Sequence, residues 1–420
     1  MGDIQKMNFI GIIILITVLG DYFLNLLADF LNLLKMKKEV PKPFEDVYDA
    51  EQYRKSQEYL RVNTRFGWVS GSFDLVIFLV FWFAGGFAFL DAWVRSFNRG
   101  PVVTGLLFIG VLLAVKAVLS LPFSIYGTFV IEERFGFNKT SVKTFISDLI
   151  KGLFLSVLLG VPILAGILWF FEYAGTFAWL YCWVAVTLVM LFIQYIAPRW
   201  IMPIFNKFTP MEEGDLKIAI FAYADAIDFP LENVYVMDGS RRSSKSNAFF
   251  TGFGKNRRIV LFDTLVAQQS VGELVAILAH EMGHYKKKHI IKSLILGILQ
   301  TGLMFFLLSV FISYEKLFEA FYLEKVSVYA GLVFFGLLYA PLDFFMGLFL
   351  LYFSRKNEYE ADRFAVETTR TPESFIAALK KLSVHNLSNL RPHPFYVFLN
   401  YSHPPVLERI ETIEEVKRSE

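Results

Sequence analysis

Seven long apolar segments constrain what this chain can fold into. A helix needs about 20 mainly apolar residues to cross a hydrocarbon core of about 30 Å. The segments that meet this requirement lie near residues 7–30, 68–90, 102–125, 148–171, 176–203, 291–313 and 328–353. Hydrophobic residues make up 55% of the chain and charged residues only 19%, below the share of about 25% typical of soluble domains. We therefore predict an all-α polytopic membrane protein with about seven transmembrane helices.

The polar segments between these spans differ in their content of basic residues. Lys and Arg are frequent in residues 204–290 and after residue 354, whereas the connection at 171–175 has none. Basic loops are generally cytoplasmic. Seven spans then place the amino terminus outside and both basic regions on the cytoplasmic side. The first apolar segment is predicted to be retained, because it is long and no clear signal-peptide cleavage site follows it.

Short elements are predicted within the polar segments. Residues 35–66 contain Pro41 and Pro43 and are predicted to form a loop. The periodicity of the next large polar segment predicts an amphipathic helix at 212–227 and strands at 233–237, 246–251 and 258–262. A small β-sheet is therefore expected beside the membrane helices.

An H-E-x-x-H pentapeptide occupies residues 280–284. Residues four apart on a helix point in nearly the same direction, so His280 and His284 can bind one metal ion while Glu281 lies beside them. Cys182 is the only cysteine and lies in an apolar run, so neither a disulfide nor a cysteine metal cluster is expected.

The helix that carries this motif has its own signals. Ser270 and Glu273 have the spacing of a capping box immediately before an apolar run. No proline follows through His289 and beyond, which predicts one continuous helix. His289 would then lie on the face opposite His280 and point away from the metal.

A third ligand is expected just after the seventh span. If residues 357–362 are helical, Glu358 and Asp362 share a face and Glu360 points elsewhere. This geometry indicates Glu358 as the ligand and Asp362 as a carboxylate that orients a ligand histidine. The alternative is a solvated acidic patch balanced by neighbouring Lys and Arg residues.

Two histidines and one glutamate form a ligand set found in many zinc peptidases. Zinc lowers the pKa of a bound water toward about 7, and Glu281 would accept that water's proton and pass it to the leaving amine. One catalytic zinc ion is therefore predicted, although other divalent ions stay open.

Further blocks of sequence accompany the pentapeptide, namely SNAF at 246–249, KNRRIVLFDTL at 255–265, HEMGHYKKKH at 280–289, SRKNEYEADRFA at 354–365 and SHPPVLERI at 402–410. In these blocks the chain resembles the integral-membrane zinc metalloproteases of the CaaX prenyl protease type, which remove the last three residues of prenylated proteins. The resemblance implies about seven helices around an internal water-filled chamber, with a gluzincin-like metalloprotease region.

With this resemblance, four regions are expected along the chain. Five amino-terminal transmembrane helices with polar loops occupy 1–203, and a cytoplasmic metalloprotease region with the H-E-x-x-H helix occupies 204–290. Transmembrane helices six and seven occupy 291–353. A carboxyl-terminal metalloprotease region with the third zinc ligand occupies 354–420.

The resemblance also implies roles for residues near the substrate. Asn247, Ala248 and Phe249 would bind the peptide along an edge strand. His403 and Arg409 would be catalytic, by holding the peptide or stabilising the developing oxyanion. Each has a plainer alternative, because Asn247 can be a turn residue, His403 a surface residue and Arg409 one end of a surface salt bridge to an acid such as Glu411.

Charged residues also lie within or near the apolar spans, at Asp21, Asp74, Lys116 and Asp343. An unpaired charge in lipid costs several kcal/mol, so these side chains are expected on a wet chamber wall. Buried ion pairs or a transport pathway are the alternatives.

The expected partners are a peptide or protein substrate, with or without a prenylated carboxyl terminus, and membrane lipids. The net charge of +2 argues against nucleic acid, and the oligomeric state is left open. The chain is short for a eukaryotic member and ends in KRSE without a retrieval signal. This favours a prokaryotic member in a bacterial or archaeal inner membrane over one in the endoplasmic reticulum.

Two other functions fit parts of the sequence. A membrane-protein quality-control metalloprotease of the heat-shock type would share the metal site, but such proteins generally have fewer spans. A channel or transporter with a structural metal would use the charges within the spans.

Overall fold

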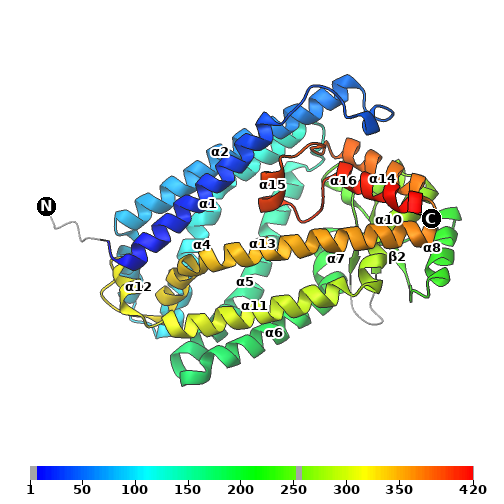
Figure 1. Cartoon of the computed structure of the whole chain (residues 1–420). Coiled ribbons are helices and arrows are strands. Elements are labelled where there is room, and N and C mark those ends of the chain that lie inside the picture. The colour runs from blue at the N-terminus through cyan, green and yellow to red at the C-terminus, as the bar shows by residue number, and fades with distance from the viewer. Residues whose placement is uncertain (1–6, 252–257, 420) are drawn as a thin grey trace.

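The computed structural model describes residues 7–251 and 258–419 (Figure 1). Among these residues, seven helical segments are long and apolar enough to cross a membrane. They are α1 (Phe9–Leu34), α2 (Ala50–Phe83), α4 (Pro101–Tyr126) with a π-helical extension to Glu132, α5 (Val142–Tyr173), α6 (Ala178–Ile196) with flanking helical turns, α11 (His289–Phe311) and α13 (Val328–Thr369). The predicted count of seven spans is confirmed.

Two of these helices extend well beyond their predicted spans. Helix α2 begins at Ala50, inside the segment predicted as a loop, because the side chain of Asp49 accepts a hydrogen bond from the backbone of Gln52 and caps it. Helix α13 continues to Thr369. The residues that carry Glu358 and Asp362 therefore extend a membrane helix without a break.

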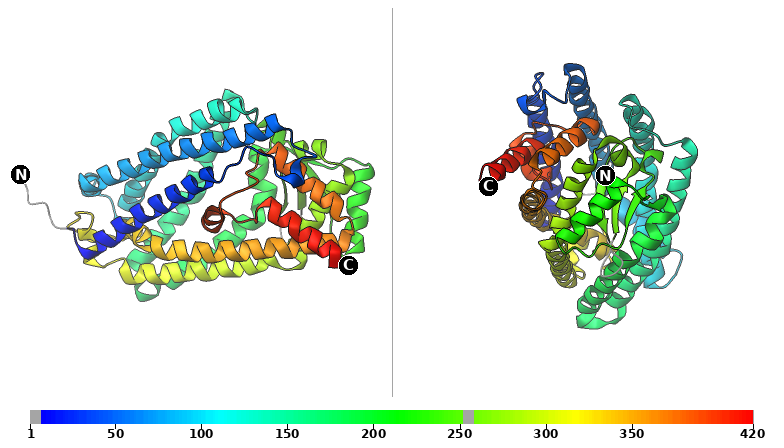
Figure 2. Two further views of the ribbon diagram at one scale, coloured as in Figure 1. Left: turned by 45° about the horizontal axis from the view of Figure 1, so that its top comes forward. Right: turned by 90° about the vertical axis from the view of Figure 1, so that its right-hand side faces the viewer.

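The long helices run lengthwise, and the polar elements gather at one end (Figure 1). Helices α8 (Asp215–Ala226), α10 (Val271–Lys286), α14 (Pro372–His385) and α16 (Val406–Ser419) lie at that end, beside the sheet. Figure 2 shows the carboxyl-terminal helices against the same end in two further views. Shorter helices complete the fold: α3 (Gly86–Arg95), α7 (Met202–Phe205), α9 (Asp263–Gln268), α12 (Glu315–Glu319) and α15 (Pro394–Asn400).

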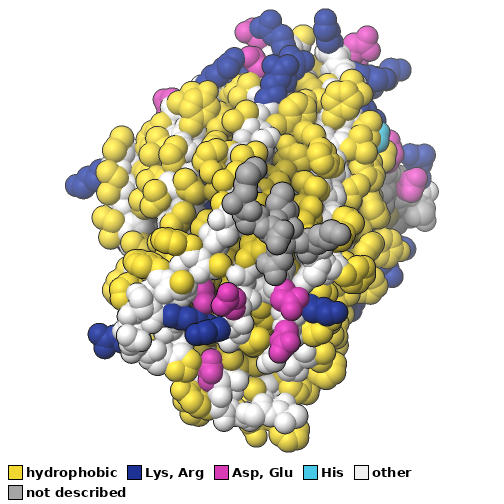
Figure 3. Space-filling model, turned by 90° about the vertical axis from the view of Figure 1, so that its left-hand side faces the viewer, with side chains coloured by type: hydrophobic (Ala, Val, Ile, Leu, Met, Phe, Trp, Pro, Cys, Tyr) yellow, Lys and Arg dark blue, Asp and Glu magenta, His cyan; other side chains and the backbone are white. Residues whose placement is uncertain are grey.

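Hydrophobic side chains dominate the outer surface of the helical part. Figure 3 shows them over most of the face at the end that carries the amino terminus. Phe89 is 73% exposed, and Trp169, Phe345 and many other large apolar side chains are also exposed. Such a surface suits a lipid environment.

The sheet has four strands in the order β1-β2-β4-β3. They are β1 (Phe208–Pro210), β2 (Val234–Met237), β3 (Ala248–Thr251) and β4 (Arg258–Phe262). Strands β2 and β4 are parallel, with Val234 opposite Ile259, and the other two pairs are antiparallel. Strand β3 therefore forms one edge, as predicted for the segment with Ala248.

A compact core joins this sheet to the helices around it. Its fully buried members come from α8, β4, α9, α10, α13, α14 and α16, and they include Leu261, Leu278, Met282, Ala365, Phe375 and Ile413. Burial of apolar side chains from α10 and α13 in one core fixes the position of these two helices relative to each other. These helices carry the candidate metal ligands.

Candidate metal centre

Helix α10 begins with the predicted capping box. The Ser270 side chain accepts a hydrogen bond from the Glu273 backbone, and the Glu273 carboxylate accepts one from the Ser270 backbone. The helix ends at Lys286, and Lys288 has a left-handed backbone with φ of 60°. The prediction of one continuous helix through His289 is therefore wrong, because the chain changes direction there and α11 starts at His289.

Gly283 lets α10 cross α13 at close range. A Cβ atom at this position would lie 3.1 Å from Cδ1 of Phe364 and 3.3 Å from both Cα and O of Ala361. Few real Cβ contacts are so tight, so a side chain would push the helices apart. The glycine within the pentapeptide thus brings the two histidines to the helix that carries Glu358.

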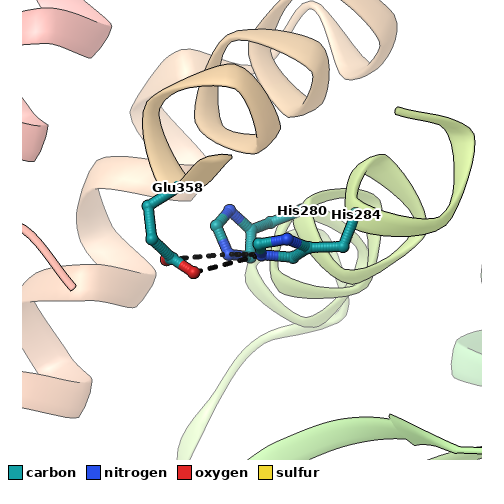
Figure 4. A group of neighbouring side chains, drawn as sticks. All are labelled: His280, His284 and Glu358. Carbon is teal, nitrogen blue, oxygen red and sulfur yellow. Dashed lines mark hydrogen bonds and ion pairs between the residues drawn. The ribbon is translucent and has the colours of Figure 1, made fainter. Parts of the chain in front are cut away.

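His280, His284 and Glu358 converge on one point (Figure 4). The Nε2 atoms of His280 and His284 are 3.1 Å apart. The carboxylate oxygens of Glu358 lie 3.2 Å from Nε2 of His284 and 3.4 Å from Nε2 of His280. In the described part of the chain, this is the group of His, Cys, Asp and Glu side chains arranged to share an ion.

These distances fit a divalent ion. Ligand atoms bound tetrahedrally at about 2.0–2.1 Å are separated from one another by about 3.3 Å. In addition, Oε2 of Glu358 is buried and has no hydrogen-bond partner among the described residues. A buried polar atom without a partner is costly, and a metal ion at this point would satisfy it.

The other nitrogen of His280 has its own partner. Its Nδ1 lies 2.8 Å from Oδ1 of Asp362, which is fully buried. Arg409 on α16 donates to both oxygens of Asp362, over 2.8 Å from Nε and 2.6 Å from Nη2. The structure thus places Asp362 where it orients the His280 ring, and Arg409 binds Asp362 instead of extending to the surface.

His284 also has partners at its other ring nitrogen. Its Nδ1 lies 3.1 Å from Nδ1 of His289, and Nε2 of His289 lies 3.1 Å from Oε2 of Glu360. His289 is buried. The prediction that it lies on the face away from the site is wrong, because the break at Lys288 turns it back toward His284. Sequence analysis set both His289 and Glu360 aside, because helical spacing alone directs them away from the metal ligands.

Charges in the site affect its titratable groups. Burial alone would lower the pKa of His280, but hydrogen bonds to Asp362 and Glu358 outweigh this and raise it to about 9 in the metal-free site. A divalent ion would compete with that proton. Burial raises the pKa of Glu281 above its ordinary value of 4.5, which suits a group that must accept and return a proton.

The structure also places the other residues that the resemblance linked to the substrate. Asn247 is exposed and immediately precedes edge strand β3, with its Oδ1 accepting a hydrogen bond from the backbone of Ala248. Phe249 borders a large cavity together with Glu281, His284 and Glu358. Nε2 of His403 lies 3.4 Å from Oε1 of Glu358, and burial lowers the pKa of this histidine.

The charged residues in the spans have polar partners. Lys116 forms an ion pair of 2.6 Å with Asp74, and Asp343 accepts a hydrogen bond from Gln300. Asp21 and Asp74 both border a second cavity, of about 420 Å³, between α1 and α2. Lys116 and Asp74 thus form an ion pair, but both side chains are about half exposed, unlike the buried ion pairs considered from the sequence. The chamber wall stays a prediction for these residues.

Comparisons with known proteins match almost the whole chain. The family described as CAAX prenyl protease N-terminal, five membrane helices, matches residues 30–207, and peptidase family M48 matches residues 210–417. CAAX prenyl protease 1 of Saccharomyces cerevisiae is 37% identical over 90% of this chain and 89% of its own length. The human CAAX prenyl protease 1 homolog is 32% identical over 92% of this chain and 91% of its own.

A solved structure has the same fold. The crystal structure of S. mikatae Ste24p covers 96% of this chain and 99% of its own, with a TM-score of 0.91 and 34% sequence identity.

Proposed function

The chain belongs to the CAAX prenyl protease family of M48 peptidases and is a multi-pass membrane metalloendopeptidase that acts on CaaX substrates, and we propose that its metal is one zinc ion held by His280, His284 and Glu358. The observations that support this ligand set are the 3.1–3.4 Å spacing of the ligand atoms of His280, His284 and Glu358 and the buried Oε2 of Glu358, which has no hydrogen-bond partner among the described residues. A zinc ion bound there would acidify a coordinated water and polarise the scissile carbonyl.

The protein groups divide the remaining tasks. Glu281 accepts the proton of the attacking water and delivers it to the leaving amine. Asp362, held by Arg409, fixes the His280 ring with Nε2 toward the ligand atoms of His284 and Glu358. His403 stands beside Glu358 and donates a hydrogen bond to the carbonyl oxygen as its negative charge develops.

The peptide binds along the free edge of the sheet. Strand β3 pairs with β4 on one side only among the described residues. An extended peptide can add to that edge through main-chain hydrogen bonds, alongside Asn247, Ala248 and Phe249. Phe249 borders the cavity that contains the metal ligands, so a peptide on this edge reaches Glu281.

The distribution of basic residues supports the proposed topology. We place the amino terminus outside and the two parts of the metalloprotease region, 204–290 and 354–420, on the cytoplasmic side, with the helices of 1–203 and 291–353 in the membrane. Family membership favours a CaaX-type protease over the heat-shock-type protease and the transporter considered from the sequence.

Purified protein in detergent provides the test. We expect about one zinc per chain by atomic spectroscopy, and cleavage of a farnesylated CaaX peptide immediately after the prenylated cysteine. Glu281→Gln should keep the zinc and lose turnover by about 10²–10⁴-fold or more, whereas Glu358→Gln should lose the zinc itself. Full activity of Glu281→Gln, or undiminished zinc in Glu358→Gln, would overturn the assignment.

A further inference from the structure

The cavity beside the metal centre is larger than a usual pocket for a small ligand. Its volume is about 1340 Å³, whereas pockets for small ligands are usually about 300–1,000 Å³. Its walls come from α5, α6, α11 and α13, with Glu281, His284 and Glu358 at one end. The space therefore continues from the metal ligands into the transmembrane part of the protein.

The lining changes from polar to apolar along three helices. Among the described residues, polar lining residues occur only toward one end of these helices, at Gln194 of α6, Lys292 and Ser293 of α11, and Ser354 and Asn357 of α13, with apolar neighbours such as Ile193, Ile290 and Phe353 between them. Farther from the ligands, the same helices contribute apolar residues, including Val186 and Met190 of α6, Leu296 and Gly297 of α11, and Gly347 and Leu350 of α13. The cavity thus has a polar end at the metal site and an apolar end within the membrane helices.

The cavity extends far enough from the metal ligands to hold a lipid chain. From Gly347 to Asn357, the lining residues of α13 rise about 15 Å along the helix axis, at 1.5 Å per residue. The lining residues of α6 and α11 run beside them, and Trp183 of α6 donates a hydrogen bond to the backbone of Ile298 on α11. This hydrogen bond joins α6 and α11 next to Gly297.

The covalent structure of a CaaX substrate requires an apolar site near the metal. Its prenylated cysteine supplies the carbonyl group that is attacked, and the side chain joins the isoprenyl group through a thioether. Only the Cα, Cβ and sulfur atoms lie between that carbonyl carbon and the first isoprenyl carbon. When the peptide bond is at Glu281, the lipid must therefore begin within a few bonds of the metal centre.

We propose that the apolar end of this cavity, between α6, α11 and α13, binds the isoprenyl chain of the substrate. This inference rests on the proposed function and adds the place where the lipid is recognised. The peptide occupies the polar end along β3, while the isoprenyl chain extends away from the metal between Met190, Gly297 and Gly347. The length of the apolar wall then determines which chain lengths are accepted.

Two glycines allow a direct test. Gly297 and Gly347 both line the cavity, and a Cβ at either position would have no atom within 4 Å. A side chain therefore has room to begin at each position, and leucine there would fill part of the apolar end. Gly336 on α13 has equally open surroundings but does not line the cavity, so Gly336→Leu is a matched control.

The measurement compares kcat/KM for two peptides of identical CaaX sequence that carry a geranyl or a farnesyl group. We expect Gly347→Leu and Gly297→Leu to lower the farnesyl-to-geranyl ratio by about tenfold or more, mainly through a higher KM for the farnesyl peptide. Gly336→Leu should keep the wild-type ratio. Zinc occupancy and folding affect both peptides equally and cancel in the ratio.

The outcomes separate the two proposals. An unchanged ratio in both cavity variants, with the wild type active, would overturn the lipid site and leave the metal assignment intact. An equal change in Gly336→Leu would also overturn it, since the effect would then not depend on the cavity. Cleavage that persists in Glu281→Gln would instead overturn the proposed catalytic residues.

Discussion

The Nδ1 atoms of His284 and His289 lie 3.1 Å apart, although the two residues belong to different helices. Lys288, with its left-handed backbone, lies between the end of α10 and the start of α11. This turn directs His289 back toward His284. Glu360 contacts the far nitrogen of His289 at 3.1 Å. Both candidate histidine ligands thus have a carboxylate behind them, His280 directly and His284 through a second imidazole.

Loss of the contacts that His289 and Glu360 provide to His284 should weaken metal binding without changing the ligands themselves. Partners of ligand histidines typically contribute 10–100-fold in metal affinity. We expect His289→Leu and Glu360→Gln each to lower zinc affinity within that range, measured by competition with a chelator of known affinity. His289→Gln, which can still hydrogen-bond to His284, should retain more affinity than His289→Leu.

His385 provides the control for this series, because it is exposed at the end of α14. His385→Leu should leave zinc affinity at the wild-type value. Equal affinity in His289→Leu and the wild type would show that His284 is oriented by other contacts.

Local patterns in the sequence correctly predicted several elements that surround the candidate site. The capping box of Ser270 and Glu273, strand 258–262 and the seven apolar spans are all determined by neighbouring residues, and all are present in the structure. The shared face of Glu358 and Asp362 follows from helical periodicity alone.

Features that depend on distant contacts could not be predicted in the same way. Lysine is an ordinary helix former, so nothing at Lys288 signals a left-handed turn. The early start of α2 depends on a cap at Asp49 followed by a polar helical stretch that hydropathy cannot distinguish from a loop. The bond between Arg409 and Asp362 joins residues on α16 and α13, which only the fold brings together.

This buried pair of Arg409 and Asp362 should show strong coupling. Removal of one partner leaves the other charge buried, at a cost of about 3–5 kcal/mol. We expect Arg409→Met to lower the thermal unfolding midpoint in detergent markedly. The double variant with Asp362→Asn should lose much less than the sum of the two single changes. Additive losses would contradict a direct interaction.

The contact between α10 and α14 should make stability depend on pH. Lys381 lies 2.7 Å from the carboxylate of Glu273. Burial alone would raise the pKa of Glu273, but hydrogen bonds from Lys381 and Ser270 outweigh it and lower the pKa below its ordinary 4.5. The folded state therefore favours the charged form, and its contribution is present above pH 4.5 and is lost as the pH falls below that value.

The unfolding midpoint of Glu273→Gln, compared with the wild type across this pH range, measures that contribution. We expect the wild type to be more stable near neutral pH and the difference to shrink in acid. Glu373→Gln is the control, because Glu373 pairs with Lys417 on the exposed surface, where such pairs contribute little. A difference that stays constant into acid would rule out the ion pair as its source.

The crossing of α10 and α13 at Gly283 should be needed for the metal site more than for the fold. Gly283→Val would place side-chain atoms against Ala361 and Phe364, whose atoms already lie 3.1–3.3 Å from an added Cβ. The helices must then separate by a few tenths of an ångström or more, and His284 moves away from Glu358. Because ligand distances tolerate only about ±0.2 Å, we expect zinc content and peptide cleavage to fall together while the protein still purifies as a folded membrane protein.

Gly272→Val is the control for this prediction. Gly272 lies on the same helix, but a Cβ there would be 3.4 Å from its nearest neighbour at Ser374, so this variant should keep its zinc. Retention of zinc by Gly283→Val would show that α10 can shift without loss of the ligand geometry.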